Sequence, residues 1–221
     1  MISAPVSQVE VDFSFAEQAY RIIRDRLVML EIRPGAPIND EHLAQGLGFG
    51  RTPVREALKR LESERLVVAF PRRGTFATEV NIKDLSHISE VRRQLEPGAA
   101  AAAARRATSV ERVDLGRLLT NLEKHHDPAA GWEALMHLDM RMHRAVYAAT
   151  HNPYLEDTLV RYDNLATRIW CVFADRLTDL AGHVGEHGPL LRAVIEGDAS
   201  KAAELAAAHV AQFEDAIRAA I

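Results

Sequence analysis

The sequence lacks several features that define common protein classes, and each absence excludes something. Its single cysteine, Cys171, cannot form a disulfide within the chain and fits a reducing, cytoplasmic location. No apolar run approaches the ~20 residues that a membrane-spanning helix needs. A basic N-terminal start followed by an apolar stretch is also missing, so we expect no signal peptide. No His-Glu-x-x-His, nucleophile elbow or phosphate loop occurs, which argues against an enzyme.

The chain does contain enough apolar residues for buried cores, and its charge is unevenly distributed. Apolar residues make up 48% of the 221 residues, and the formal net charge is −4. Between Gly50 and Arg73, however, seven basic residues stand against three acidic ones, so this segment has a net charge of +4. A basic segment in an otherwise acidic protein indicates a local nucleic-acid site.

The first 80 residues have the pattern of three helices followed by a β-hairpin. Apolar residues recur at helical spacing in the helices, and Pro34-Gly35 ends the first of them. The expected elements are a polar lead-in over 1–12, helices over 15–31, over 40–47 and from Thr52, and strands over 67–70 and 75–79. This order predicts a winged helix-turn-helix, which we assign to residues 10–80.

The third helix carries basic side chains on one face and apolar side chains on the other. Such a helix can lie in a DNA major groove while it packs on its own domain. The expected DNA-facing residues are Arg51, Thr52, Arg55 and Arg60, and the expected buried residues are Val54, Leu58, Leu61 and Leu66. The alternative is an ordinary solvated face, and Glu56 is expected to pair with Arg60 one turn later. The basic hairpin that follows favours DNA binding.

The run RTPVREALKRLESERLV, followed by RRGTF, resembles the winged helix-turn-helix of the GntR family of bacterial transcription regulators. The resemblance implies that Arg51 and Arg55 read bases or hold phosphates. It also implies that Thr52 contacts a phosphate at the start of the helix. The wing tip, which approaches the minor groove, is expected at Arg72, Arg73 and Gly74.

The chain departs from the usual family pattern at three positions. Gly50 replaces a serine that would offer a hydroxyl to phosphate, and Glu41 stands where a basic residue is common. Arg65 stands where a glycine is expected after the third helix. These departures leave the core of the motif intact.

After Val80 the strand signals vanish, and alanine and leucine dominate, which predicts an antiparallel all-α bundle over 81–221. The expected helices are 82–107, 109–126, 130–150, 153–177, 179–197 and 199–220. Pro97-Gly98 should kink or divide the first of these. Asn152 and Asp198 should cap the helices that follow them.

Four residues of this half are candidates for a divalent metal site, namely Asp139, His143, His187 and His209. Asp139 and His143 are four residues apart and therefore share one helix face. His187 and His209 lie on either side of the Gly197-Asp198 turn between two antiparallel helices. One carboxylate and three imidazoles suit Zn, Ni, Mn or Fe. The alternative is ordinary core histidines, because histidines four apart also arise by chance, as His183 and His187 do.

The segments SEVRRQLEPGAAAAAARR, DMRMHRAVYAATHNPYL and EHGPLLRAVIEGDASKAAELAAAH resemble the FCD ligand-binding domain of the FadR subfamily of GntR regulators. The resemblance implies that the four candidates bind a metal and that small organic acids are the effectors. A divalent ion held by one carboxylate keeps a positive charge, which attracts an effector carboxylate.

Arg92 is the candidate for a second contact to that carboxylate, and the alternative is a surface ion pair with Glu96. We interpret four further histidines of this half as surface residues or neighbours of the ligands, namely His125, His126, His151 and His183.

Together these patterns predict a DNA-binding transcription regulator, a repressor rather than an activator, whose operator affinity changes when a small organic acid binds. Two winged helices on the half-sites of a palindromic double-stranded operator imply a homodimer. One alternative is a small metallohydrolase that activates water at the Asp/His site, although it leaves the N-terminal half unexplained. Another alternative is a DNA-binding protein without any ligand.

Overall fold

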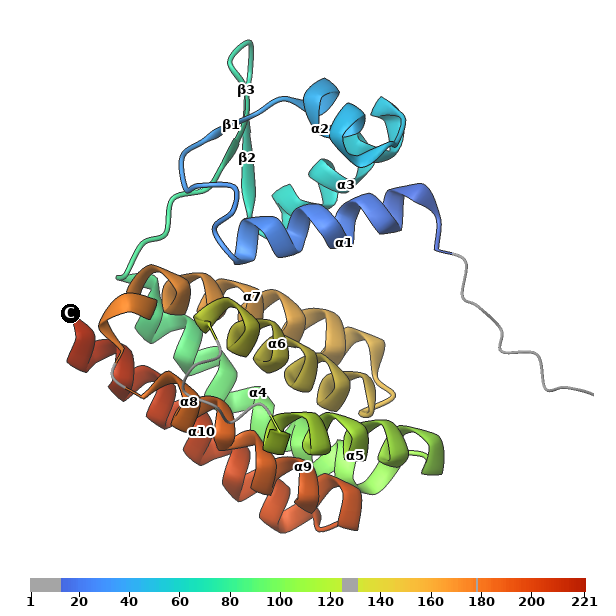
Figure 1. The fold of residues 1–221 in the computed structure, drawn as a ribbon, viewed down its shortest axis with the longest axis vertical. Coiled ribbons are helices and arrows are strands. Elements are labelled where there is room, and N and C mark those ends of the chain that lie inside the picture. The colour runs from blue at the N-terminus through green and yellow to red at the C-terminus, as the bar shows by residue number, and fades with distance from the viewer. Residues whose placement is uncertain (1–12, 125–130, 178) are drawn as a thin grey trace, which may run out of the picture. The chain divides into compact units, whose positions relative to one another are not determined.

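The computed structural model describes residues 13–124, 131–177 and 179–221 (Figure 1). The chain divides into an N-terminal unit, Met1–Leu27 with Gly35–Thr78, and a helical unit, Val28–Pro34 with Glu79–Ile221. The predicted lead-in over 1–12 lies outside the described residues, as do His125 and His126. Within the described ranges, no helix is long and apolar enough to cross a membrane.

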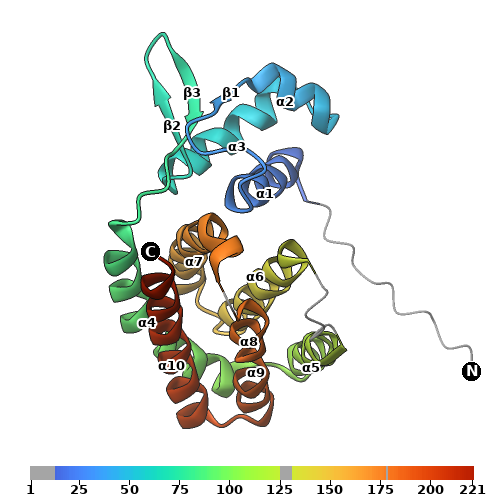
Figure 2. The ribbon, with the colours of Figure 1, turned by 60° about the vertical axis from the view of Figure 1, so that its left-hand side comes forward.

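The N-terminal unit combines three helices with a small antiparallel sheet (Figure 2). Its elements are α1 (Phe15–Val28), β1 (Pro37–Ile38), α2 (Asp40–Leu47), α3 (Arg51–Ser63), β2 (Val67–Phe70) and β3 (Gly74–Ala77). The central strand is β3, since Val68 of β2 and Pro37 of β1 both pair with Phe76. The predicted hairpin is the β2–β3 pair. Strand β1 was not predicted, because its two residues are too few to show an alternating pattern.

Side-chain caps and apolar stripes explain why these helices form. Asn39 accepts hydrogen bonds from the first free backbone N–H groups of α2, and Gly48 ends this helix at a φ of 71°. The predicted interior of α3 is buried, with Val54 and Leu61 fully enclosed and Leu58 7% exposed. The face of α3 opposite these residues is left for polar and charged side chains.

The helical unit is an antiparallel bundle in which α4 and α10 lie side by side (Figures 1 and 2). Its described elements are α4 (Asp84–Arg106), α5 (Ser109–Lys124), α6 (Trp132–Ala148), α7 (Pro153–Phe173), a 3-10 turn (Ala174–Arg176), α8 (Leu180–Gly185), α9 (His187–Glu196) and α10 (Ala199–Ala220). One detail differs from the prediction: the helix expected over 179–197 is two helices that meet at Glu186. Pro97 lies inside α4, which continues through it undivided.

Predicted caps position the helices that carry the candidate ligands. Asn152 accepts a hydrogen bond from the N–H of Leu155, 3.3 Å away, and so starts α7 before Pro153. Gly197 ends α9 at a φ of 82°, a value that favours glycine. Asp198 then caps α10 through the N–H of Lys201 at 2.9 Å. The result is a tight α9–α10 hairpin.

Arg65 adopts a φ of 64° directly after α3, in the left-handed region that glycine occupies without strain. We therefore expect Arg65→Gly to raise the free energy of unfolding of the N-terminal unit by about 0.5–1 kcal/mol. Urea denaturation measures the change. The control is Arg65→Ala, which removes the side chain but keeps the Cβ atom, and equal stabilisation by both substitutions would contradict the backbone explanation.

Candidate functional site

The helical unit brings the four predicted metal ligands together in its core. Helix α6 supplies Asp139 and His143, α9 supplies His187 and α10 supplies His209, and all four are buried. One potential ligand atom from each lies within 4.8 Å of the others. The Nε2 atom of His143 is 3.1 Å from that of His187 and 3.3 Å from that of His209. Two atoms bound to one ion at about 2.1 Å each lie roughly 3 to 4 Å apart, so the arrangement fits a single metal ion.

Each imidazole of this cluster is oriented by a partner on its other nitrogen. Nδ1 of His143 lies 3.0 Å from the Tyr147 hydroxyl, and Nδ1 of His209 lies 2.9 Å from a Glu186 carboxylate oxygen. Nδ1 of His187 donates to the Val184 carbonyl oxygen at 3.1 Å, which leaves the lone pair of its Nε2 directed at the cluster. Such partners raise the basicity of the ligands and hold the rings in place.

Burial controls the protonation of the cluster. It lowers the pKa of His187 to about 3 and holds the pKa values of His143 and His209 well below their usual value. The three rings are therefore neutral and able to bind a metal. Burial, together with the nearby Asp163 carboxylate, raises the pKa of Asp139 well above its ordinary value.

A divalent ion would remove the cost of ionising Asp139. Among the described residues, no group donates a hydrogen bond to the buried Oδ1 atom of this residue, so a charged oxygen there is poorly compensated. Neutral imidazoles and one carboxylate are ligands that Zn, Ni, Mn and Fe accept. The residues present therefore fit a divalent metal, which FCD domains can bind.

Arg92, predicted to contact an effector, lies beside this cluster and is 2% exposed. It forms an ion pair with Glu96, as the alternative interpretation expected, but the pair is buried rather than on the surface. Burial opposes its charge, yet the neighbouring Glu96, Tyr147 and Asp163 raise the pKa of Arg92 above its usual value. The guanidinium therefore stays charged at the cavity, whose volume is about 10 Å³ and whose walls include Asp139 and Phe213.

The structure describes two of the four further histidines, His151 and His183. His183 is buried, with its ring stacked on Trp170 and His209 at centroid distances of 4.3 Å for both pairs. It is therefore a neighbour of the ligands and not a surface residue. His151 is exposed and lies 3.0 Å from a Glu111 carboxylate oxygen, which agrees with the surface interpretation.

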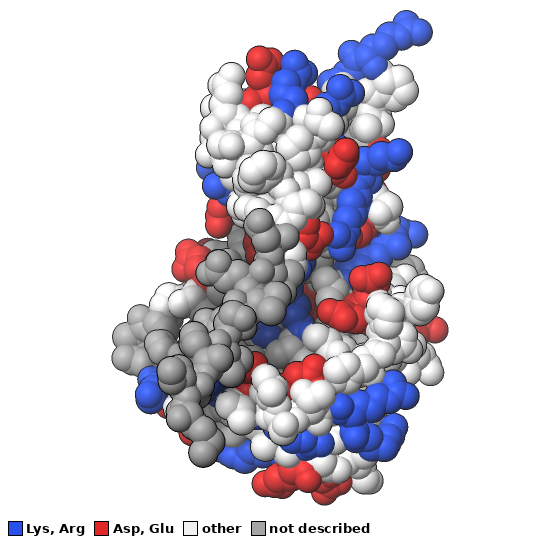
Figure 3. All heavy atoms as spheres, turned by 90° about the vertical axis from the view of Figure 1, so that its right-hand side faces the viewer, with Lys and Arg blue, Asp and Glu red and all other residues white. Residues whose placement is uncertain are grey.

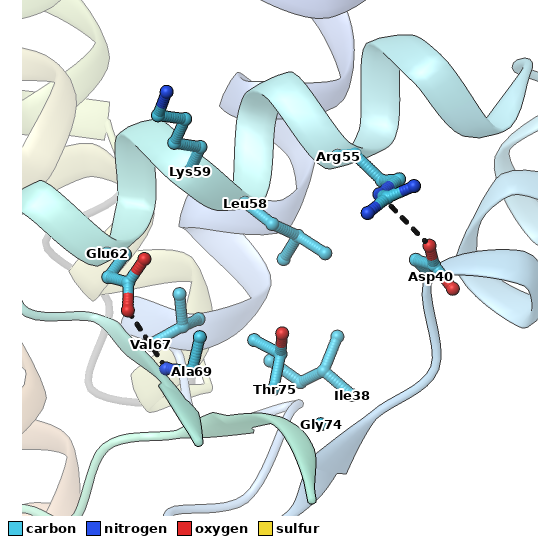
Figure 4. Close-up of a pocket in the computed structure, with 10 residues that line it drawn as sticks. All are labelled: Ile38, Asp40, Arg55, Leu58, Lys59, Glu62, Val67, Ala69, Gly74 and Thr75. Carbon is cyan, nitrogen blue, oxygen red and sulfur yellow. Dashed lines mark hydrogen bonds and ion pairs between the residues drawn. The ribbon is translucent and has the colours of Figure 1, made fainter. Parts of the chain in front are cut away.

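The N-terminal unit presents the predicted DNA-facing arginines of α3 to solvent. The side chains of Arg51 and Arg55 are 57% and 72% exposed. Both lie near the carboxylate of Asp40, at 3.4 and 3.7 Å, and Figure 4 shows Arg55 and Asp40 directed at each other. Thr52 is exposed in the first turn of α3, where Gly50 supplies no side-chain cap. The backbone N–H groups of this turn therefore remain available for a phosphate.

A groove separates α3 from the sheet of the same unit. Its cavity has a volume of about 300 Å³ and is lined by Arg55 and Lys59 of α3 and by Gly74 and Thr75 of β3 (Figure 4). At the wing, Arg72 and Arg73 are exposed, and Gly74 has a φ of 95° that a side chain would disfavour. Lys and Arg side chains project from the surface of the unit, with acidic side chains among them (Figure 3).

Arg60, which was also predicted to face DNA, has several partners within the N-terminal unit. It pairs with Glu17 at 2.9 Å and Glu64 at 3.3 Å, rather than with Glu56, and its guanidinium lies 3.6 Å from the centre of the Tyr20 ring. The reason is that α1 packs beside the C-terminal half of α3. Arg60 therefore connects α1 to α3, with 46% of its side chain exposed.

Three residues that lie near the four candidate ligands were not predicted from the sequence, namely Tyr147, Asp163 and Glu186. Tyr147 continues the spacing of Asp139 and His143 by one more helical turn, a signal that could have found it. Asp163 stands in the middle of α7 without any spacing that relates it to the ligands. Only the packing of α7 against α4 and α6 places it there.

Comparisons with known proteins agree with this geometry. The family model described as bacterial regulatory proteins, gntR family, matches residues 15–77, and the FCD domain model matches residues 87–212. An uncharacterized HTH-type transcriptional regulator in an unstable DNA locus of Streptomyces ambofaciens is 27% identical over 197 residues, which cover 89% of this chain and 82% of that protein.

Two further comparisons concern Escherichia coli proteins. The HTH-type transcriptional repressor RspR of strain K12 is 32% identical over 94 residues, so the match spans 42% of this chain and only 40% of that protein. The solved structure of E. coli McbR/YncC has the same fold, with a TM-score of 0.80 at 23% identity over 94% of this chain and 98% of that chain.

A winged helix with exposed arginines, joined to a helical unit with a buried ligand cluster, defines a DNA-binding transcription regulator with an effector-binding domain. The chain belongs to the GntR family of bacterial regulatory proteins, and its second half is an FCD domain, which fits the FadR subfamily. Its relatives are named as transcriptional regulators, which excludes the metallohydrolase alternative. The chain is therefore a regulator and not an enzyme.

The buried histidines predict how stability depends on pH in the metal-free protein. The pKa of His187 is about 3 in the folded chain, against 6.5 ordinarily, so the unfolded chain binds a proton that the folded chain excludes. The free energy of unfolding should therefore fall as the pH decreases from about 6.5 towards 3. Asp139, whose folded pKa is raised, acts oppositely, because its contribution is lost as the pH rises through that pKa.

The measurement is the thermal midpoint of chelator-treated protein between pH 7 and about 4.5, a range inside the window that linkage gives for the histidine. His187→Asn keeps a side-chain donor for the Val184 carbonyl but removes the titrating ring, so its midpoint should depend less steeply on pH. Exposed His42→Asn is the matched control. Parallel profiles for His187→Asn and the parent would contradict the assignment.

Proposed function

We propose that this regulator is a homodimeric repressor whose operator affinity is controlled by a small carboxylate bound at a divalent metal in the helical unit. The observation that carries the proposal is the convergence of three Nε2 atoms and the Asp139 carboxylate in the bundle core. Their partners on Tyr147, Val184 and Glu186 support a metal site rather than an ordinary histidine core, because every ring is already turned towards one point.

Asp139, His143, His187 and His209 would hold the ion. When bound, it would supply a positive centre in a dry site, and an effector carboxylate could add to it. Arg92 is the second contact that we propose for this carboxylate, since its charged guanidinium reaches the same cavity.

The small size of the cavity supports control by conformational change. A volume of about 10 Å³ accommodates one water molecule but no organic acid. An effector can therefore enter only when the helices around the cavity, α4, α6, α7 and α10, have moved apart. A ligand shifts such an equilibrium by the difference in its affinity for the two forms, and we propose that the wider form binds the operator less tightly.

In the N-terminal unit we propose that Arg51, Thr52 and Arg55 contact bases and phosphates in the major groove and that the wing at Arg72, Arg73 and Gly74 approaches the minor groove. The exposure of these side chains and the free helix start support this assignment. A second copy supplies the second half-site of a palindromic operator. The assignment as a repressor rests on relatives such as RspR, which is named a transcriptional repressor.

The contrast between two arginines of α3 tests the DNA interface. Arg55→Ala should weaken operator binding about tenfold or more, since a base contact contributes roughly 1–3 kcal/mol, without changing the thermal midpoint. Arg60→Ala should instead lower the thermal midpoint, because Arg60 joins Glu17, Tyr20 and Glu64. Fluorescence anisotropy with operator DNA and thermal unfolding measure the two effects. Unchanged operator affinity in Arg55→Ala would remove that residue from the interface.

The metal site and its link to DNA are tested together. Elemental analysis should find about one equivalent of divalent metal in the parent protein and little in His187→Ala, because the variant lacks a ligand. His151→Ala, which removes an exposed histidine, is the control and should retain the metal.

A panel of small carboxylates is then titrated into the operator complex of each protein. At least one acid should release the parent and the control from DNA but leave His187→Ala bound. Two results would contradict the proposal. The parent protein binds no metal after reloading, or an acid releases His187→Ala from DNA as readily as it releases the parent.

A further inference from the structure

Asp163 is a second buried carboxylate beside the candidate metal site. It lies on α7, is 1% exposed and shares the cavity wall with Asp139 and His143. Its Oδ1 atom is 3.8 Å from Nε2 of His143, and the Oδ2 atom of Asp139 is 3.9 Å from the same nitrogen. Asp163 is therefore as near to this ligand nitrogen as the carboxylate already assigned to the ion.

The same oxygen of Asp163 also lies near Arg92. Its distance to Nη2 of the guanidinium is 3.7 Å, while Nε of Arg92 pairs with Glu96. Asp163 Oδ1 thus lies between a metal-binding nitrogen and the guanidinium. In the proposed function, the effector carboxylate binds the ion that this nitrogen would hold and the same guanidinium.

We propose that Asp163 is an internal competitor of the effector: its carboxylate binds the metal when no effector is present and must leave that position when one binds. This inference rests on the proposed function, because it concerns the same site. Asp163 Oδ1 lies near both a nitrogen that would hold the ion and the guanidinium, so the internal and the external carboxylate would compete for one position.

The charges around the cavity support this competition. The charge of Arg92 is balanced by Glu96, so Asp139 and Asp163 together balance a divalent ion. The closed core with its metal is then neutral, which is the favourable state for a dry interior. An added carboxylate would place a further negative charge beside Asp163 unless that side chain moves away.

Competition of this kind would determine effector specificity. A monocarboxylate such as acetate offers one metal contact and gains little by replacing Asp163. An acid that adds a second metal-binding oxygen or further contacts can replace it. Asp163 would therefore prevent abundant simple carboxylates from acting as effectors.

Cobalt(II)-loaded protein tests the ligand directly, because its visible absorption depends on the number and type of ligands. Asp163→Asn should change this spectrum, since a carboxylate is lost from the ion. The matched control is Asp157→Asn, which removes the same charge from an exposed position of α7 and should leave the spectrum unchanged. Identical spectra for Asp163→Asn and the parent would overturn the proposal.

Acetate, titrated into the same cobalt(II) proteins, tests the competition. Asp163→Asn should bind acetate at least about tenfold more tightly than the parent, because a like charge and an occupant are both removed. Asp163→Glu retains a carboxylate and should restore weak binding. Equal or weaker acetate affinity in Asp163→Asn would also overturn the proposal. Thermal midpoints with bound cobalt verify that each variant is folded.

The failure of this inference can be distinguished from that of the proposed function. An Asp163→Asn variant with an unchanged spectrum, in a protein whose operator complex still responds to carboxylates, overturns only the role of Asp163. The opposite outcome is a changed spectrum and tighter acetate binding in a protein whose operator complex responds to no acid. This outcome supports Asp163 as a competitor but contradicts control of DNA binding by the site.

Discussion

The buried Asp139 carboxylate, enclosed by three neutral imidazoles, is the constraint on which the helical unit depends. A charged oxygen without a hydrogen bond in a dry core is costly, and the nearby Asp163 increases the cost. A divalent cation bound there would offset this cost and would join α6, α9 and α10 at one point. The packing of these helices and the occupancy of the site would then be linked, since each would favour the other.

Through such a link, binding at the site would change the arrangement of the helices around it. The cavity at the cluster accommodates one water molecule, so a larger ligand requires the surrounding helices to separate. Arg92, which an organic acid would meet there, is already engaged by Glu96. A carboxylate that binds this guanidinium would therefore compete with an existing interaction, and selectivity would depend on the difference between two sets of contacts.

In the N-terminal unit, similar arginines have different roles because of what packs around them. Arg55 lies 72% exposed at the groove between α3 and the sheet, whereas Arg60, little more than one turn later, is held by Glu17, Glu64 and the ring of Tyr20. A guanidinium held between two carboxylates and an aromatic ring has few donors left for DNA. The arginines at the start of α3 and at the wing are instead exposed.

The sequence by itself determined the winged helix, the all-α second half, the helix caps at Asn152 and Asp198, and the identity of the four candidate ligands, because periodicity, capping and residue spacing are local properties. Only the tertiary structure decided the break at Glu186, the burial of Arg92 and His183, the role of Arg60, and the position of Asp163. These depend on which helices meet. Asp163 belongs to the site only because Arg92 of α4 and His143 of α6 lie near it. Both residues are distant from Asp163 in the sequence, so no local pattern predicts this position.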